Sequence, residues 1–447
     1  MIRLISLIIS IVIGVQFAVT PAPAAEEART RVVLQIGLEE VVRLSLCNSE
    51  ELKIKDNQVN KSEGIYKETR AGILPHLSAQ SLWTKNMEYP DTADDKTDYA
   101  LEGGINASQV IWSFGRVMYA VKSAQQAMEA SRFNREAGRQ EIIYAAKLGY
   151  YSTLLTRNTL AITEKSYANA LENKELMGKR SYGGRSPKYE IIRMNAEVAA
   201  RVPTVNEART EFDAATETLK KMIDAEPDCR LALSGDFSQE YADLDYASLV
   251  SLMNEREPSL KSLNKNIESA EAQVKSRYAG LLPTVSAFAS LSRAGGSNEH
   301  SFLRDDRLDP YTSAGLKVEF PIWEGGLKEA QLRQSHADKE IAVLRRKQAG
   351  KELLLELKRS CLEYRQYKSN LAANIEAVNL AEESFKQSQE MFASGQISLA
   401  DLNDAELLLT NQRLNKEMTL FNINITLAKI ERLIAGEYDG REAGKKI

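Results

Sequence analysis

One short motif occurs twice in this chain of 447 residues, and it restricts the fold more than any other feature. Ala71–Ala79 reads AGILPHLSA, and 208 residues later Ala279–Ala287 reads AGLLPTVSA. The hydrophobic pattern changes at both copies. Proline stops a preceding helix and is tolerated at the first residue of a strand. Pro75 and Pro283 are therefore predicted to mark two equivalent junctions between a helix and a strand.

Helices are predicted before each junction and pairs of strands after it. Leu38–Gly72 and Tyr246–Gly280 each have the pattern of one helix. Beyond the prolines, apolar and polar residues alternate over about ten to fourteen positions, which is the strand pattern. Strands of this length cross a bilayer when tilted, but they are equally compatible with a soluble, half-buried hairpin. The predicted strands lie at about 74–88, 98–112, 283–294 and 311–322.

A very long helix is predicted after each pair of strands. No convincing break interrupts the sequence from about Leu327 to Phe392. Apolar residues from Leu354 to Val378 step by three and four, as in a coiled-coil seam. About 65 helical residues make a rod of roughly 100 Å. No ordinary globular core needs such a helix, so it is expected to bridge a distance.

Short turns are predicted to end both long helices and to return the chain. One turn spans Tyr182–Pro187 and the other Ser394–Ser398. Ser398 and Asp401 have the spacing of a capping box. The returning helices are expected at about 187–223 and 399–434. Pro203 is expected to kink or interrupt the first of them.

The N-terminus has the three parts of a secretory signal. Arg3 supplies a positive charge, Leu4–Thr20 is an almost unbroken apolar run, and Pro21–Ala25 offers small residues for cleavage. Residues 1–25 are therefore predicted to be a signal peptide, with an uncleaved membrane anchor as the alternative. No later segment has the pattern of a transmembrane helix, so membrane insertion would have to use strands closed into a barrel.

The composition argues against several functional classes. The chain has 58 basic and 62 acidic residues, a balance that gives no basic patch for nucleic acid. Its three histidines and three cysteines are scattered and leave little for a metal site. A Gly-rich phosphate loop and a Ser/His/Asp constellation are both missing from the sequence. We therefore expect no enzyme activity, no cofactor, no metal and no nucleic-acid partner.

The duplicated order of helix, strand pair, long helix, turn and return helix resembles the TolC-like outer-membrane efflux proteins. The resemblance covers nearly the whole chain after the signal, and it includes both Leu-Pro junctions and the motif Gly395-x-x-Ser398-x-x-Asp401-Leu402. It implies a mainly α fold with a membrane β-barrel portion, in which the duplicated unit forms a trimeric α-barrel and β-barrel channel-tunnel. The first repeat, with the N-terminal segment and connector, would be 26–245, and the second, with the C-terminal tail, 246–447.

The same resemblance implies a function and partners. A homotrimer would sit in the outer membrane, contact its lipid and extend its helices into the periplasm. The N-terminal segment, the connector and the C-terminus would form a belt around the tunnel. The trimer would be a passive conduit for efflux or type I secretion, joined by a periplasmic adaptor (a membrane fusion protein) to an inner-membrane pump of the RND or ABC type. The alternative is a periplasmic coiled-coil scaffold without a pore, which would explain the rods but not the alternating strands.

At the periplasmic end, the resemblance assigns roles to individual residues. Asp401 and Asp404 share one helical face, and acidic residues at these positions face the lumen in the family, where threefold symmetry would stack them as two rings. The chain departs from the family at Tyr189, Phe392 and Ile397, which replace acidic or polar partners. We therefore expect a cation-selective entrance whose closure is weaker or achieved differently. The turns are expected to dock the adaptor tips through Gly183, Gly184, Ser186, Gly395 and Ser398.

The cysteines allow one further hypothesis. Cys47 lies in the first helix and Cys229 in the connector, which the family places on the same belt, and the periplasm is oxidising. A Cys47–Cys229 disulfide is therefore one possibility, and two buried free thiols are the other. Cys361 lies in the apolar seam and is expected to be a small core residue.

Overall fold

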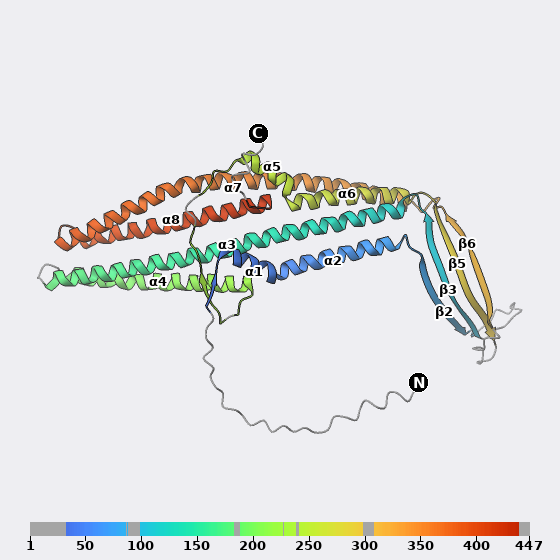
Figure 1. Cartoon of the computed structure of the whole chain (residues 1–447), viewed down its shortest axis with the longest axis horizontal. Coiled ribbons are helices and arrows are strands. Elements are labelled where there is room, and N and C mark those ends of the chain that lie inside the picture. The colour runs from blue at the N-terminus through green and yellow to red at the C-terminus, as the bar shows by residue number, and fades with distance from the viewer. Residues whose placement is uncertain are drawn as a thin grey trace, which may run out of the picture.

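The computed structural model describes residues 33–85, 87, 99–182, 188–226, 228–237, 241–297 and 308–437. The molecule is a long rod in which helices run side by side, with a sheet at one end and two helical hairpins at the other (Figure 1). The predicted signal peptide, residues 1–25, lies outside the described residues.

The same order of elements occurs twice along the chain. The first set is α1 (Leu38–Asn48), α2 (Glu50–Ala71), β2 (His76–Lys85), β3 (Tyr99–Trp112), α3 (Arg116–Tyr182) and α4 (Lys188–Ile223). The second set is α5 (Tyr246–Arg256), α6 (Pro258–Ala279), β5 (Thr284–Ser297), β6 (Asp309–Glu319), α7 (Leu327–Ser394) and α8 (Leu399–Ile434). Short strands β1 (Val33–Ile36) and β4 (Arg230–Leu233) precede the two sets. The long helices and return helices therefore lie where the sequence pattern predicts them.

The four long strands form one antiparallel sheet in the order β2-β3-β5-β6. The two repeats meet where β3 pairs with β5, with Tyr99 opposite Ser297 and Ala107 opposite Ala289. Among the described strands, β2 pairs only with β3 and β6 only with β5, so both are edges. All the side chains of β2 are exposed. A sheet with two long open edges is a template for pairing with further strands.

The two prolines of the repeated motif lie between helix and strand. Pro75 falls between the end of α2 and the start of β2, and Pro283 falls between α6 and β5. The strand bounds differ slightly from those predicted, because β5 continues to Ser297 and β6 spans Asp309–Glu319. The apolar residues that follow β6 lie outside the hydrogen-bonded ladder, and the alternation alone does not mark where pairing ends.

The two stretches predicted as single helices are each divided in two. Ser49 ends α1 and caps α2, because its hydroxyl accepts a hydrogen bond from the amide of Leu52 at 3.2 Å. Pro258 occupies the first turn of α6, after the cap residue Glu257. Pro203, which was predicted to kink or interrupt its helix, does not interrupt it, because α4 continues through this residue. There the packing of α4 along α3 outweighs the loss of one backbone hydrogen bond.

A regular ladder of serines joins α6 to α3. The hydroxyls of Ser262, Ser269 and Ser276 donate to carbonyl oxygens of α3 at 2.9–3.0 Å. The acceptors are the carbonyls of Ala130, Ser123 and Arg116. Donors and acceptors both recur every seven residues, in opposite chain directions, which is the spacing of a coiled-coil seam. Small side chains here let the two helix backbones approach closely and fix their register.

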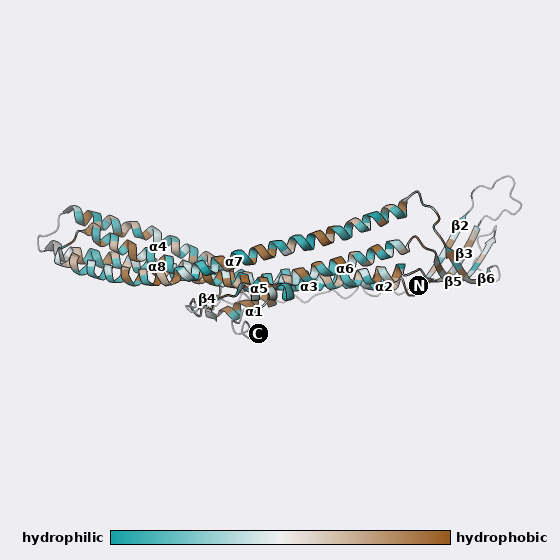
Figure 2. Ribbon diagram, turned by 90° about the horizontal axis from the view of Figure 1, so that it is seen from above, coloured by the Kyte–Doolittle hydropathy of each residue, from teal (hydrophilic) through white to brown (hydrophobic). Residues whose placement is uncertain are grey.

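The hairpins at the other end of the rod are coiled coils. On α7, buried residues recur at intervals of seven: Leu357, Tyr364, Leu371, Val378, Phe385 and Phe392. The predicted seam included these positions up to Val378, but its intermediate members are more open, with Leu354 40% exposed. The last two residues belong to a buried cluster formed with Met177 of α3, Met194 of α4 and Leu402 of α8. Figure 2 shows apolar and polar residues interleaved along these helices, as narrow seams require.

A compact region surrounds the middle of the rod. β1 pairs in parallel with β4, which joins the N-terminal segment to the connector between the repeats. A second buried cluster here combines Val41 of α1, Leu154 of α3, Leu249 of α5 and Leu433 of α8. This region is the belt predicted from the resemblance, and it binds the two repeats to each other.

Candidate functional site

The turn between α7 and α8 is built by a glycine and a reciprocal cap. Gly395 has φ 84°, a left-handed conformation that glycine adopts without strain. The amide of Asp401 donates to the hydroxyl oxygen of Ser398 at 3.3 Å. In return, the Ser398 amide and hydroxyl donate to the Asp401 carboxylate at 2.9 and 2.7 Å. The predicted capping box is therefore present, and the hydrogen bonds from Ser398 lower the pKa of Asp401.

Both predicted entrance carboxylates lie on the surface close to this turn. Asp401 and Asp404 are exposed, while Leu399 and Leu402 between and beside them point into the buried cluster of the hairpins. A carboxylate engaged in capping keeps a fixed position, because the cap ties it to the backbone of Ser398. The structure thus brings together Gly395, Ser398, Asp401 and Asp404 within three helical turns.

The other predicted tip lies outside the described residues. Gly183, Gly184 and Ser186 fall between α3 and α4, in a stretch where neither backbone nor side chains are described. Of the residues that depart from the family, Tyr189 is 70% exposed, whereas Phe392 is only 1% exposed and packs in the apolar cluster. In this structure Phe392 therefore serves the packing of the core.

A buried ion pair just beyond this turn was missed by the sequence analysis. Arg201 of α4 lies 2.6 Å from a carboxylate oxygen of Glu406 of α8, and the Glu406 side chain is only 1% exposed. A signal was present in the sequence: Leu399, Leu402, Glu406 and Leu409 follow the spacing of a helix core stripe, so the glutamate occupies a core position.

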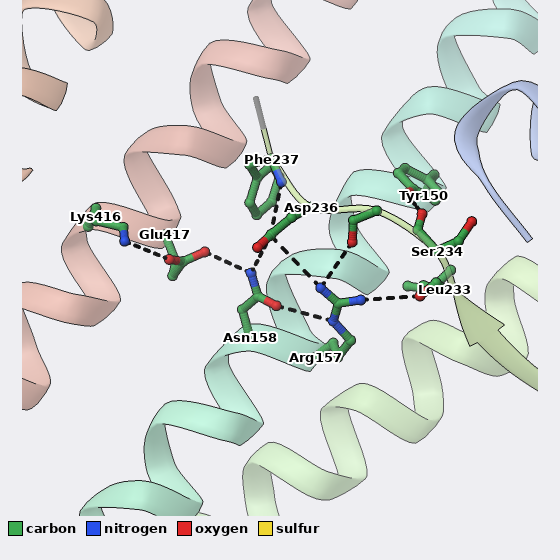
Figure 3. A network of polar contacts seen from close by, with 10 residues as sticks. Tyr150, Arg157, Asn158, Leu233, Ser234, Asp236, Phe237, Lys416 and Glu417 are labelled. Carbon is green, nitrogen blue, oxygen red and sulfur yellow. Dashed lines mark hydrogen bonds and ion pairs between the residues drawn. The ribbon is translucent and has the colours of Figure 1, made fainter. Parts of the chain in front are cut away.

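A second polar network holds the belt to the long helices (Figure 3). Arg157 of α3 donates to the carbonyl oxygens of Leu233 and Gly235 in the connector, both at 3.3 Å. Asn158 donates to Asp236 at 3.2 Å and to Glu417 of α8 at 2.8 Å. Through these two neighbouring residues, α3 of the first repeat is tied both to the connector and to the second repeat.

Further charged contacts continue along the same pair of helices. Lys147 of α3 lies 2.7 Å from Glu431 of α8, and Arg432 of α8 lies 3.1 Å from Glu141 of α3. Burial raises the pKa of Glu431, although Lys147 opposes the shift. Burial likewise raises the pKa of Glu257, the cap residue of α6. The belt is therefore fastened by buried polar groups as well as by apolar packing.

The predicted disulfide between Cys47 and Cys229 is absent from the structure. Cys47 is exposed on α1, on a different face from the buried residues Val41 and Ser45. The thiol of Cys229 donates to the carbonyl oxygen of Arg230 at 3.7 Å. Both cysteines are free, so no bond joins their sulfur atoms. Cys361 is half-buried against the apolar cluster of the belt, where burial raises its pKa.

Two searches of the described residues bear on the class of site. Within them, no group of His, Cys, Asp and Glu side chains is placed to hold a metal ion. No helix in those stretches combines the length and the apolar character needed to cross a membrane.

Comparison with known proteins finds a family that the second repeat matches. Residues 249–436, the second repeat, match the sequence model of the outer membrane efflux proteins. The chain is 26% identical over 243 residues to the outer membrane efflux protein BepC of Brucella suis, and 22% identical over 311 residues to the pyoverdine export protein OpmQ of Pseudomonas aeruginosa. The second repeat is similar to the outer membrane efflux proteins.

The likeness to this family extends over both repeats at the level of the fold. The alignments span 54% of this chain and 51% of BepC, and 68% of this chain and 65% of OpmQ. Two solved outer-membrane proteins agree in fold over nearly the whole chain. The CmeC channel of Campylobacter jejuni has a TM-score of 0.78 at 15% identity, covering 92% of this chain and 88% of its own. VceC of Vibrio cholerae has a TM-score of 0.77 at 16% identity, covering 90% and 97%. The fold is that of an outer-membrane channel-tunnel.

Proposed function

We propose that three copies of this chain form a passive export conduit across the outer membrane and periplasm. The observation that carries the proposal is the sheet with two open edges on top of helices of about 100 Å. In one chain, β2 and β6 each have a partner on one side only. Joining β6 of one copy to β2 of the next would close a barrel and leave no edge in the membrane.

Exposed aromatic residues at the end of the sheet support its placement in lipid. Trp112 at the end of β3 is 59% exposed, and Trp323 after β6 is 82% exposed. Leu82, Ile105 and Leu316 on the strands are also more than half exposed. Tryptophans at the rim of an apolar band are typical of strands that meet the membrane interface.

Partners follow from the assembly that this family serves. The proposed conduit has no energy source of its own, so it needs an inner-membrane pump of the RND or ABC type and a periplasmic adaptor between them. The two turns at the far end of the rod are the proposed docking points for the adaptor. Besides the pyoverdine export protein OpmQ, the relatives include the alkaline protease secretion protein AprF of Pseudomonas aeruginosa and the toluene efflux pump outer membrane protein TtgC of Pseudomonas putida. We therefore propose that the pump, and not this chain, selects the cargo.

Three measurements on the full-length chain test the proposal. The mature protein should leave an outer-membrane fraction only with detergent, should have three times the mass of one chain after correction for bound detergent, and should conduct ions in planar bilayers. Release by salt alone, with no conductance, would support the alternative of a periplasmic scaffold.

A further inference from the structure

The two faces of the four-stranded sheet differ in charge. Residues opposite each other on antiparallel strands share a face, so the register assigns the strand residues to one side or the other. One face carries the acidic residues Glu102, Asp309 and Glu319. The other face is mainly apolar, and along the described strands its charged residues are Lys85 of β2 and Arg293 of β5, both positive. We call this second side the apolar face.

The two cations occupy equivalent positions of the internal repeat. The motif copies that begin at Ala71 and Ala279 lie 208 residues apart, and the same 208 residues separate Lys85 from Arg293. Lys85 is the tenth and last residue of β2, and Arg293 is the tenth residue of β5. Both strands begin next to the helices and lead away from them (Figure 1). Each repeat therefore carries a positive charge near the far end of the apolar face.

In the proposed barrel, these cations lie at the outer boundary of the membrane. The apolar face would turn toward lipid and the acidic face toward water. Ten residues of a strand tilted by about 40° rise roughly 25 Å, which is the height of the apolar band in such barrels. Aromatic rings mark the same level. Trp83 stacks on Tyr99 with ring centroids 6.1 Å apart, and the Lys85 ammonium lies 5.6 Å from the Tyr99 centroid.

A hollow on the apolar face lies beside Arg293. Its volume is about 560 Å³. Gly103 is directly opposite Arg293 in the ladder, and Ser81 is directly opposite Gly103, so two small side chains leave space next to the arginine. The apolar part of the lining includes Leu101, Ile105 and Leu291. A hollow of this kind can receive a hydrocarbon chain while the charged head of the same molecule lies at the guanidinium.

We propose that Arg293 and this hollow bind a phosphorylated, acylated lipid of the outer leaflet, and that Lys85 binds the same class of lipid in the first repeat. The proposal rests on the proposed function, because the closed barrel is what turns the apolar face toward lipid. A guanidinium can make two parallel hydrogen bonds to a phosphate, whereas an ammonium acts as a point charge. Arg293 is therefore expected to contribute more than Lys85. Threefold symmetry would place both cations three times around the barrel.

Binding of lipid A, used as the phosphorylated and acylated probe, to the full-length trimer tests the proposal. Native mass spectrometry gives one dissociation constant for lipid A and another for lipid A from which the phosphates have been removed. The wild type is expected to bind the phosphorylated form more tightly. Arg293→Gln should weaken binding of that form by about tenfold, because charge-assisted hydrogen bonds to phosphate are lost. Adding Lys85→Gln should make the two forms bind alike.

A change at Gly103 tests the hollow separately from the charge. A Cβ added to Gly103 would lie 3.9 Å from its nearest neighbours, atoms of Gln80 and Ser81, so a side chain fits there without a clash. Gly103→Val should weaken binding of the phosphorylated and dephosphorylated lipids by the same factor, because it fills space for the acyl chain and leaves the cation in place. Unchanged binding of both forms would show that the hollow holds no acyl chain.

The matched control lies on the opposite face of the sheet. Lys317 of β6 pairs with Glu319 at 2.9 Å on the acidic face, so Lys317→Gln should leave both dissociation constants unchanged. Trimer content and thermal midpoint, measured for every variant, separate lost binding from misfolding. Folded Arg293→Gln trimers that bind phosphorylated lipid A as tightly as the wild type would overturn the proposal, as would an equal effect of Lys317→Gln. Wild-type trimers without conductance in planar bilayers would overturn the proposed function instead.

Discussion

At the scale of single residues, the turn after α7 depends on one left-handed glycine. Gly395 has φ 84°, and its amide donates to the carbonyl oxygens of Met391 and Phe392. Asparagine tolerates this conformation better than a β-branched residue does. We expect Gly395→Val to abolish export while the amount of trimer in the outer membrane is unchanged, because the bulky side chain would block close approach of the adaptor.

The matched variant for this turn is Gly395→Asn, which should retain most of the export. Export is measured as cargo or dye released by cells that also express the pump and adaptor. Loss of trimer in Gly395→Val would mean that the glycine serves folding alone, and normal export would argue against docking at this turn.

A buried carboxylate in the belt predicts a dependence of stability on pH. Glu257 is 6% exposed, and burial raises its pKa above the unfolded value of about 4.3. A carboxylate with a raised pKa in the folded state binds its proton more tightly there. The folded state therefore loses stability as the pH rises through the folded pKa, and it has its full stability only below the unfolded pKa.

Replacement by glutamine isolates this effect. Glu257→Gln keeps an oxygen that can accept from the amide of Ser259, so it should raise the thermal midpoint at pH 8 and have little effect near pH 4. The exposed residue Glu255 on α5 provides the control, and Glu255→Gln should shift neither midpoint. Equal midpoints for Glu257→Gln and wild type at pH 8 would show that burial of this carboxylate costs nothing.

At the scale of elements, the serine ladder makes α3 and α6 one rigid pair. Ser262 is 1% exposed and donates to the carbonyl oxygen of Ala130 at 3.0 Å. Ser262→Ala should cost about 1 kcal/mol through the lost hydrogen bond. Ser262→Val should cost about 1–3 kcal/mol, because extra methyl groups force the close helices apart.

Hydrogen exchange of the α6 amides measures the effect locally, since it reports the free energy of local opening. Faster exchange is expected in both variants and more so in Ser262→Val. Ser62→Ala is the control, because the hydroxyl of Ser62 donates only to Val59 on its own helix. If Ser262→Val exchanges no faster than Ser62→Ala, the ladder does not fix the distance between α3 and α6.

The elements that sequence reasoning found are those with long, regular patterns. The helices α7 and α8 were predicted nearly to the residue, because a seven-residue spacing repeats along them without a break. The breaks at Ser49 and Pro258 were missed, because a single cap residue is a weak signal inside a long helical pattern. The interruption predicted at Pro203 was wrong, since a long packed helix tolerates one proline.

The same distinction between local and long-range signals applies to the candidate site. The cap at Ser398 and Asp401 could be predicted, because both partners lie within four residues of each other. The ion pair of Arg201 and Glu406 spans two helices and depends on how the hairpins dock. The disulfide was predicted from membership of one region, but a bond also requires two side chains that face each other.

At the scale of the whole molecule, the contacts along α3 and α8 differ between the belt and the turns. Near the belt, α3 holds α8 through Lys147 and Asn158, and the connector is clamped to the same surface. Toward the turns, α3 buries polar residues as well as Ala170 and Met177, and an ion pair joins α4 to α8.

In a trimer, the end of the rod at the turns would carry six aspartates from three copies of Asp401 and Asp404. Like charges that are stacked in a narrow, wet constriction attract cations and repel anions. Asp401 also caps α8, so its substitution would alter the helix end as well as the charge. A substitution of Asp404 changes the charge without removing the cap. We expect Asp404→Asn to shift the selectivity toward anions, and the double variant Asp401→Asn with Asp404→Asn to lose block by divalent cations added on the periplasmic side.

Reversal potentials and block in planar bilayers measure both effects. Asp213→Asn removes an exposed carboxylate from α4, far from the turn, and should leave both unchanged. Selectivity is a property of the assembled lumen, whereas cap loss acts on one helix end. A Ser398→Ala variant should therefore lower the thermal midpoint without removing divalent block. If the double variant keeps wild-type selectivity and block, the two aspartates do not face the lumen, and the charge that selects cations must lie elsewhere along the tunnel.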